Sequence, residues 1–425
     1  MNDKTVLICT VGGSHQPIVR AIEDLRPSRI CFICSADDPA TGNKGSYIQI
    51  TGRGNVIRAR HGDEKPTLPN IPSQVGMSAD GFEVIEVSPD DFDDIYGKAG
   101  RWLEAHLSGS GRMVADYTGG TKTMSAALVA AALDHERVAL HLVTGSRSNL
   151  LRVDDGHEQS IPASVEETRF HRRFRQALLP WGAYAYDQAE RLLDAMKPPS
   201  RPLSRGEYQR ARDLSRAFAR WDRFDHAGAK GIIEHYRPKL GADHGPLLSA
   251  LDRLTGEHPS REPMRLFDLW RNAERRAAQG RYDDAVARIY RLLEWSAQWL
   301  LREKQIDTSD VPAEKIPEGI TLTENRNGRR QAGLYSAWVL AAHHCGGEVT
   351  AFWTDNHKAM LDHLQARNHS ILAHGFQPLQ KTAWQHFARW AEDRLLPFLL
   401  AQAGRPEYRV KSLPPQLPDR FEGKA

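Results

Sequence analysis

The stretch QARNHSILAHG places Arg367 and His374 at the two ends of a short polar and apolar segment. Histidine titrates near neutral pH and can move a proton, and the planar fork of an arginine can stabilise a phosphorane. Such a pair suits metal-independent RNA cleavage, in which a ribose 2′-OH attacks the adjacent phosphodiester. The chain contains 18 histidines, however, so on spacing alone two unrelated, solvated side chains are the better interpretation.

The geometry of this pair depends on where the helix that carries Arg367 ends. If the whole segment were helical, the seven-residue step would return both side chains to one face, about two turns apart. If the helix ends near Asn368, a turn can bring them closer, and Gly375 is a natural stop after His374. The sequence leaves both geometries open.

Two glycine loops form a second group of candidate residues. TVGGSHQPI follows the first predicted strand, and DYTGGTKTMSAAL follows what we expect to be the fourth. Each turns on paired glycines and enters a helix, where Pro17 fits the first turn of one and Thr118 or Thr121 can cap the other. Backbone amides, helix N-termini and Lys122 suit an anionic ligand. Glycine pairs also make tight turns without any ligand, and neither loop has P-loop or G-x-G-x-x-G spacing.

These loops belong to an α/β pattern. From Thr5 to Val153, β-branched apolar runs alternate with helical patterns, which predicts a Rossmann-like domain with a parallel sheet covered on both faces. Both loops then emerge at the carboxyl edge of the sheet, where ligands of such folds bind. Between Thr41 and Met77 the pattern breaks into a Gly- and Pro-rich excursion. Cys31 and Cys34 form a CxxC within a strand, so they point to opposite faces as core residues.

After Val153 almost every segment is helical in pattern. The predicted organisation is an α/β domain over residues 1–160, an all-α connector over 161–262, an all-α bundle over 263–403 and a flexible Pro-rich tail over 404–425. The net charge of +3 makes nucleic-acid contact a local property of the surface. The N-terminus does not read as a signal peptide, so we expect a cytoplasmic protein.

Taken together and in this order, the motifs resemble the CARF–HEPN ancillary ribonucleases of type III CRISPR systems. The resemblance is carried by TVGGSHQPI, DYTGGTKTMSAAL, the helix YDDAVARIYRLLE, and RNHSILAHG, in which Arg, Asn and His match the HEPN nuclease signature. It covers nearly the whole chain apart from the tail.

The resemblance implies a homodimer whose N-terminal CARF domains bind a cyclic oligoadenylate and so activate cleavage of single-stranded RNA by the HEPN domains, without a metal or another cofactor. By this resemblance the catalytic residues are Arg367 and His374, supported by Asn368. The ligand-binding residues that it implies are Thr10, Gly12, Gly13, Ser14, Thr118, Gly119, Gly120, Thr121 and Lys122, with His15 and Arg147 as additions.

Two other interpretations remain open at this point. The chain can be a nucleotide-sensing regulator without catalysis, whose helical part binds protein or nucleic acid, although the intact Arg367 and His374 pair argues against this. Chemistry can also take place in the α/β domain itself, where a ring ligand would be cleaved if its 2′-OH were held in line for attack.

Overall fold

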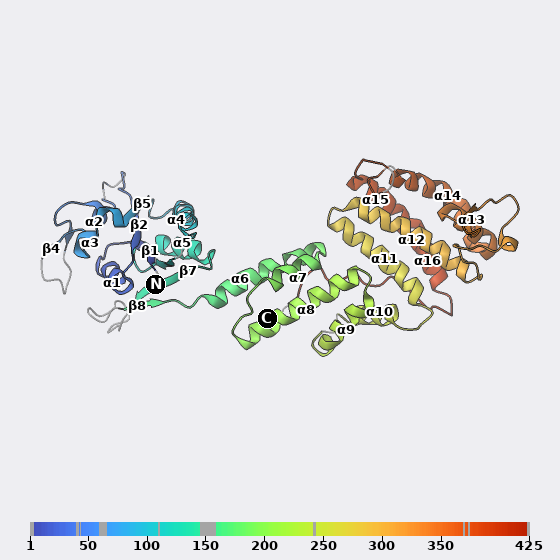
Figure 1. Ribbon diagram of the computed structural model, residues 1–425, viewed down its shortest axis with the longest axis horizontal. Helices are drawn as coiled ribbons and strands as arrows, with labels where there is room; N and C mark the ends of the chain where they lie inside the picture. The colour runs from blue at the N-terminus through green and yellow to red at the C-terminus, as the bar shows by residue number, and fades with distance from the viewer. Residues whose placement is uncertain are drawn as a thin grey trace. The chain divides into compact units, whose positions relative to one another are not determined.

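The computed structural model of the chain describes residues 4–39, 42, 44–58, 66–108, 111–144, 159–240, 244–368, 370–372 and 375–422. The chain divides into two compact units, Met1–Arg172 and Arg173–Ala425 (Figure 1). Within the described part of the chain, no helix combines the length and the apolar composition that crossing a membrane requires.

The first unit is built on a six-stranded sheet. Its strands are β1 (Thr5–Val11), β2 (Arg29–Ser35), β5 (Phe82–Val87), β6 (Arg112–Asp116), β7 (Val138–Thr144) and β8 (Gln159–Pro162). The order is β5-β2-β1-β6-β7-β8, and every pair is parallel except β7 with β8. The expected α/β domain is confirmed, but the sheet is mixed rather than wholly parallel. The antiparallel edge strand was missed because QSIP is short and contains one β-branched apolar residue, so it lacks the repeated apolar pattern of a strand.

Helices cover both faces of this sheet (Figure 1). On one face, α1 (Gln16–Leu25) packs with the short helices α2 (Ile48–Thr51) and α3 (Ile71–Gln74). On the other face lie α4 (Phe92–His106) and α5 (Lys122–Leu133), whose alanines allow close packing against the strands. Cys31 belongs to the α4/α5 side and Cys34 to the α1 side, which confirms that this CxxC pair is split across the sheet.

The excursion after β2 has its own small elements. A hairpin of β3 (Ile57–Arg58) and β4 (Thr67–Leu68) follows α2, and the 3₁₀ turn η1 (Ala79–Gly81) leads into β5. Three isoleucines attach the excursion to the α1 side of the core, with exposures of 5% or less: Ile50, Ile57 and Ile71. The excursion is therefore an integral part of this unit.

The helical part of the chain begins with α6 (Glu166–Leu178). The connector elements that follow are η2 (Leu179–Ala183), α7 (Tyr186–Asp194), α8 (Pro202–Asp222), α9 (His226–Tyr236), η3 (Arg237–Lys239) and α10 (Gly245–Thr255). The bundle elements are α11 (Arg261–Ala278), α12 (Tyr282–Arg302), η5 (Ala313–Lys315), the hairpin β9 (Thr323–Glu324) and β10 (Arg330–Gln331), α13 (Leu334–Cys345), α14 (Gly347–Asn368), α15 (Lys381–Trp390), the π turn η6 (Ala391–Leu395) and α16 (Leu396–Ala403).

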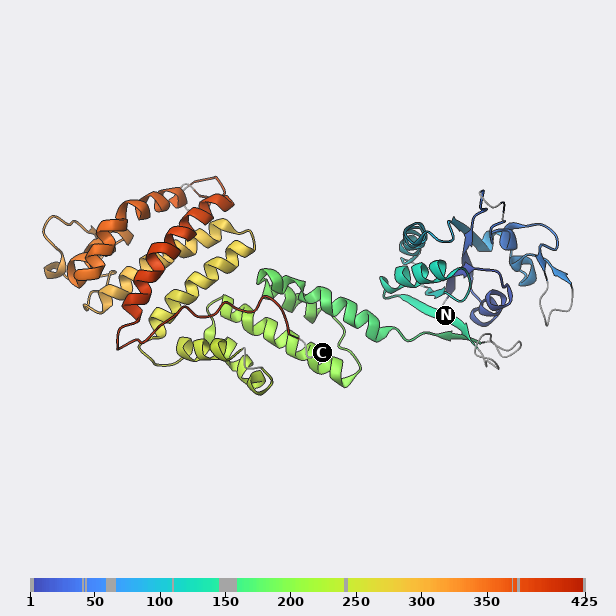
Figure 2. The same cartoon turned by 180° about the vertical axis from the view of Figure 1, so that it is seen from behind.

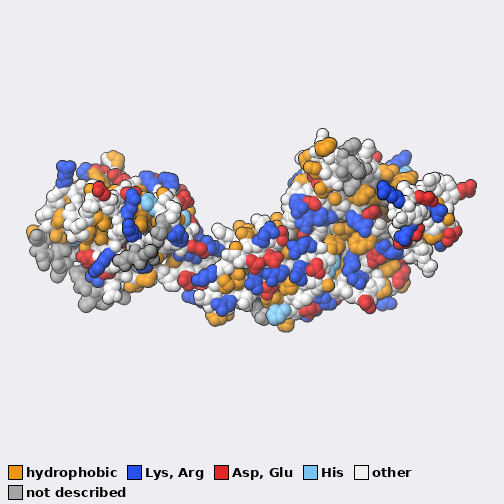
Figure 3. Space-filling view, in the orientation of Figure 1, with side chains coloured by type: hydrophobic (Ala, Val, Ile, Leu, Met, Phe, Trp, Pro, Cys, Tyr) orange, Lys and Arg blue, Asp and Glu red, His pale blue; other side chains and the backbone are white. Residues whose placement is uncertain are grey.

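Connector and bundle share one continuous apolar core, which runs from Trp181 in η2 to Leu417 near the end of the chain. Residues 173–425 accordingly form one compact unit. On the face drawn in Figure 3, acidic and basic side chains are intermixed over this unit, as the net charge of +3 leads one to expect.

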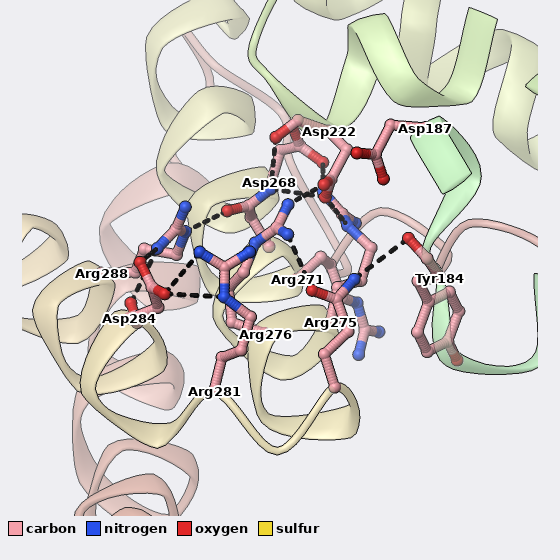
Figure 4. A network of polar contacts seen from close by, with 12 residues as sticks. Tyr184, Asp187, Asp222, Asp268, Arg271, Arg275, Arg276, Arg281, Asp284 and Arg288 are labelled. Atoms are coloured by element: carbon pink, nitrogen blue, oxygen red, sulfur yellow. Dashed lines mark hydrogen bonds and ion pairs between the residues drawn. The ribbon is translucent and has the colours of Figure 1, made fainter. Parts of the chain in front are cut away.

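A buried network of charges joins the end of α8 to α11 (Figure 4). Asp222 accepts hydrogen bonds from Arg275 Nε at 2.7 Å and from Asn272 Nδ2 at 2.8 Å, and it pairs with Arg276. Asp268 lies 2.8 Å from His226 Nε2. The Arg275 side chain is wholly buried, and this burial lowers the pKa of its guanidinium. Its charge therefore depends on these carboxylates.

The last segment of the chain differs from the expected flexible tail. Figure 2 shows it running back along the helical unit after α16. Its backbone carbonyls accept hydrogen bonds from the half-buried Arg271, Nε to Pro414 O at 2.9 Å, and from the buried Tyr186, OH to Pro418 O at 2.6 Å. Gln416 Oε1 accepts one from Arg275 at 2.7 Å. A Pro-rich segment makes few hydrogen bonds within itself, so its carbonyls are free to accept from side-chain donors of the neighbouring helices.

Candidate functional sites

The first candidate site lies where the strand order of the sheet reverses. From β1 the chain moves to β2 on one side, whereas β6 pairs with β1 on the other side. The two glycine loops follow β1 and β6, so they emerge next to each other at the carboxyl edge. This is the position at which open α/β sheets bind ligands.

The two loops touch, and their glycines allow this contact. Thr10 Oγ1 donates a hydrogen bond to Gly119 O at 2.6 Å. A Cβ atom on Gly12 would lie 2.5 Å from Gly120 N, and Gly120 has a φ of +80°. These glycines therefore have the structural role that the sequence left open, which is to allow tight turns. It does not exclude binding, because the same absence of side chains exposes backbone amides to a ligand.

A cavity of about 640 Å³ opens beside these loops. Four of the residues expected to bind the ligand line it: Gly12, Gly13, Gly120 and Thr121. Among the described residues, six others of that set lie on the same loops but do not line the cavity: Thr10, Ser14, His15, Thr118, Gly119 and Lys122. Arg147 lies outside the described residues.

Hydrogen bonds show what the loop hydroxyls do in this structure. Thr121 caps α5 by accepting from Met124 N at 3.1 Å and donates to Pro89 O at 2.6 Å. Thr118 Oγ1 accepts from Val143 N at 2.7 Å. Thr10, bonded to Gly119 O, is fully buried. The hydroxyls therefore shape the loops, and the start of α5 presents its partial positive charge beside the cavity.

Sequence reasoning missed the other wall of the cavity. Among the described residues, eight of the fifteen that line it belong to the excursion after β2: Lys44, Gly45, Ser46, Ile48, Gln49, Val56, Ile57 and Arg58. A signal was available, because β2 ends at the same carboxyl edge as β1 and the segment NKGSYIQITGRGNVIR that comes after it is rich in polar and basic residues.

Asp116, the last residue of β6, carries a carboxyl group buried at this edge. Its Oδ1 accepts a hydrogen bond from Thr118 N at 3.0 Å, whereas Oδ2 has no hydrogen-bond partner among the described residues. Burial raises the pKa of this carboxyl above its ordinary value of 3.8. Ionised Asp116 therefore costs the folded state free energy.

The Asp116→Asn variant is expected to be more stable than the wild type at pH 7 and to lose that advantage in acid. Because the pKa of this carboxyl is raised in the folded state, the wild type loses stability as the pH rises from the pKa of the unfolded chain toward the pKa of the folded protein. Asparagine has no such dependence and can still accept from Thr118 N. Chemical unfolding of both proteins between pH 3 and pH 7 checks this, and a stability difference that does not change with pH would contradict it.

The second candidate site is at the end of α14. This helix ends at Asn368, so the broken-helix geometry is the one present and the continuous seven-residue step is not. Arg367 and Asn368 occupy its last turn, whereas His374 lies outside the described residues. Beyond the helix, Ser370 is buried, forms a bridge with Gln377, and accepts a hydrogen bond from Gly375 N at 3.1 Å. The chain thus folds back sharply after the helix.

Neighbouring helices anchor this turn. Both carboxylate oxygens of Asp283, at the start of α12, accept from Leu379 N at 3.2 and 3.1 Å. About one helical turn before Arg367, His363 stacks on Phe387 of α15 with a centroid distance of 4.7 Å. Burial lowers the pKa of His363, which favours its neutral form. The end of α14 is therefore held between α12 and α15.

Three large apolar side chains of this turn are exposed: Ile371, Leu372 and Phe376, with exposures of 60%, 50% and 92%.

Metal chemistry needs a cluster of suitable ligands, and among the described residues no group of three or more His, Cys, Asp or Glu side chains could hold an ion. His343 and His344 lie in the last turn of α13, before Gly346 with its φ of +64°.

Comparison with known families identifies the bundle. Residues 256–395 match the family model described as the Csm6 HEPN domain, which confirms the resemblance to the CARF–HEPN ribonucleases in this part of the chain. No curated protein is significantly similar to the chain in sequence.

The solved structures that are similar to the chain include two of low identity. Enterococcus italicus Csm6 bound to cyclic hexa-2′-fluoro-hexa-dAMP is 11% identical, with 93% of this chain and 94% of that chain covered and a TM-score of 0.49. Can2 from Sulfobacillus thermosulfidooxidans in complex with cyclic tetra-adenylate is 12% identical, with coverages of 60% and 69% and a TM-score of 0.24. Because both TM-scores are below 0.5, the function assigned to the chain rests on the family match and on the geometry of the two sites.

Proposed function

Because its C-terminal bundle is a HEPN domain of the Csm6 type, we propose that the chain is an endoribonuclease of type III CRISPR defence. It acts in the cytoplasm, cleaves single-stranded RNA without a metal ion, and is switched on when its N-terminal domain binds a cyclic oligoadenylate. The observation that carries this proposal is the family match over residues 256–395, which include Arg367, Asn368 and His374.

The chemistry depends on the two catalytic side chains. His374 moves the proton of the attacking 2′-OH or of the leaving oxygen, and Arg367 stabilises the charge that develops on the phosphorus oxygens. The attacking 2′-OH forms a bond to phosphorus while the bond to the 5′-oxygen breaks, which leaves a 2′,3′-cyclic phosphate. Asn368, beside Arg367 in the last turn of α14, supports the arrangement.

The cavity at the carboxyl edge of the sheet supports the sensing role. Glycine amides, the start of α5 and the basic residues of the excursion all favour an anion. We do not extend the proposal to cleavage of the ring itself, because the hydroxyls of Thr10, Thr118 and Thr121 are engaged in hydrogen bonds to the backbone.

The proposal includes a homodimer with a composite nuclease site. The exposed side chains of Ile371, Leu372 and Phe376 support this, since they lie next to the catalytic motif and burying them against a second copy would remove apolar surface from water. Light scattering after size exclusion measures the mass directly.

The experiment that tests the function is cleavage of a fluorogenic single-stranded RNA in the presence of a chelator. Cyclic tri-, tetra- and hexa-adenylate are added in separate reactions. We expect one ring to trigger cleavage and the Arg367→Ala variant to remain silent with it. Binding of a ring without cleavage under any of these conditions would instead favour a non-catalytic sensor.

A further inference from the structure

The excursion after β2 forms a fixed wall of the ligand cavity. Gln49 Nε2 donates a hydrogen bond to Gly12 O at 2.6 Å, which ties the excursion to the first glycine loop. Ser46 and Ser35 exchange hydrogen bonds between backbone N and side-chain Oγ, both at 2.9 Å. A Cβ on Gly45 would lie 2.1 Å from Ser35 O, so glycine is required there. The wall is therefore in place before any ligand arrives.

Two basic side chains line this wall, and they differ in their surroundings. Lys44 Nζ lies 2.8 Å from Asp37 Oδ2, and Asp37 Oδ1 also accepts from Gly45 N at 2.8 Å. The hydrogen bond from Lys44 lowers the pKa of Asp37, so the carboxylate stays ionised and offsets the lysine charge. Lys44 thus serves to hold the turn at Gly45.

Arg58 lies at the end of β3, on the same cavity. Its side chain is exposed, and among the described residues it has no carboxylate partner. The glycine loops opposite offer amides and the start of a helix, but these carry only partial charges. Arg58 therefore presents a full positive charge to the cavity that no described carboxylate offsets, on a planar group with five donors that matches the two free oxygens of a phosphodiester.

We propose that Arg58 binds a phosphodiester of the ligand, while the Lys44–Asp37 pair only supports the wall that presents it. This inference rests on the proposed function of the N-terminal domain and assigns the excursion a role in recognising the nucleotide. The ligand class is an oligonucleotide whose backbone oxygens face Arg58 on one side and the glycine amides on the other.

The test compares full-length variants that differ in which charge they lose. Calorimetric titration with cyclic tri-, tetra- and hexa-adenylate, each in a separate experiment, gives the Kd of each ring. For the ring that the wild type binds, Arg58→Ala is expected to raise the Kd by about 10- to 100-fold, since hydrogen bonds to charged groups are the strong ones. The Kd of Arg58→Lys should fall between those of the wild type and Arg58→Ala, because lysine keeps the positive charge and lacks the planar group with its parallel donors.

The matched control is Arg53→Ala, which removes the same charge from an exposed residue of the same excursion that does not line the cavity. Its Kd is expected to change by less than about threefold, because an exposed charge away from the ligand is screened by water and salt. Arg58→Ala should also weaken the salt dependence of binding, because one ionic contact is lost. If Arg58→Ala bound the ring with wild-type affinity, the role given to Arg58 would be wrong, whereas the proposed sensing function would stand. A wild type that binds none of the three rings would overturn the proposed sensing function, and the inference with it.

Discussion

The His374→Ala variant is expected to cleave single-stranded RNA about 10²- to 10⁴-fold more slowly than the wild type, the range typical for loss of a general acid or base. Alanine cannot move the proton of the 2′-OH or of the leaving oxygen. Titration with the activating ring should give an unchanged Kd, because the proposed ring site lies in the other unit. Initial rates with a fluorogenic RNA at saturating ring measure the effect.

His343 provides a matched control for this experiment. It is an exposed histidine on α13 of the same bundle, and the proposed mechanism gives it no role. His343→Ala is expected to retain the wild-type rate. If His374→Ala also retained it, the catalytic assignment would be wrong, although the HEPN fold would stand. Arg367→Lys then separates the charge of the arginine from its planar geometry, and we expect it to be impaired as well.

The Asp222→Ala variant is expected to show the largest loss of stability, about 3–5 kcal/mol, because breaking a buried ion pair leaves the other charge uncompensated. Arg275 has no exposed side-chain surface, and its Nε donates to Asp222 at 2.7 Å. The Asp222→Asn variant keeps a hydrogen-bond acceptor and should lose less stability than Asp222→Ala. Urea unfolding, followed by the tryptophan fluorescence of the helical unit, measures the difference.

An exposed aspartate on the same unit serves as the comparison. Asp393 pairs with Arg389 across one turn at 3.8 Å, and both side chains are mostly exposed. Asp393→Ala is expected to change stability little, because exposed pairs are screened by water and salt. Equally small losses for both aspartates would mean that Asp222 is not needed to neutralise Arg275.

The sequence predicted the architecture where the pattern of apolar residues is regular. Buried strands, the helix start at Pro17 and the split of Cys31 from Cys34 follow from local periodicity and capping chemistry, whereas the cap of α5 was left open between Thr118 and Thr121 and is Thr121 in the structure. The edge strand β8 could not be found in this way, because a four-residue strand that is largely exposed is defined by its pairing with β7.

The candidate sites were predictable in part for a similar reason. The two glycine loops are visible as motifs, and their meeting at one edge follows from the rule for parallel sheets. Arg58 and Gln49 reach the same cavity through long-range contacts, which leave no short motif. The docking of the chain end was also hidden, since the acceptors are backbone carbonyls of a Pro-rich segment and carry no side-chain signature.

The shared core of connector and bundle has a mechanical consequence. One apolar cluster and one C-terminal segment extend from η2 and α7 to α16 and are fastened by Asp222, Arg275 and Gln416. Bending between α8 and α11 would break the buried ion pairs of Asp222, so we expect a displacement of the connector helices to carry α11 with it.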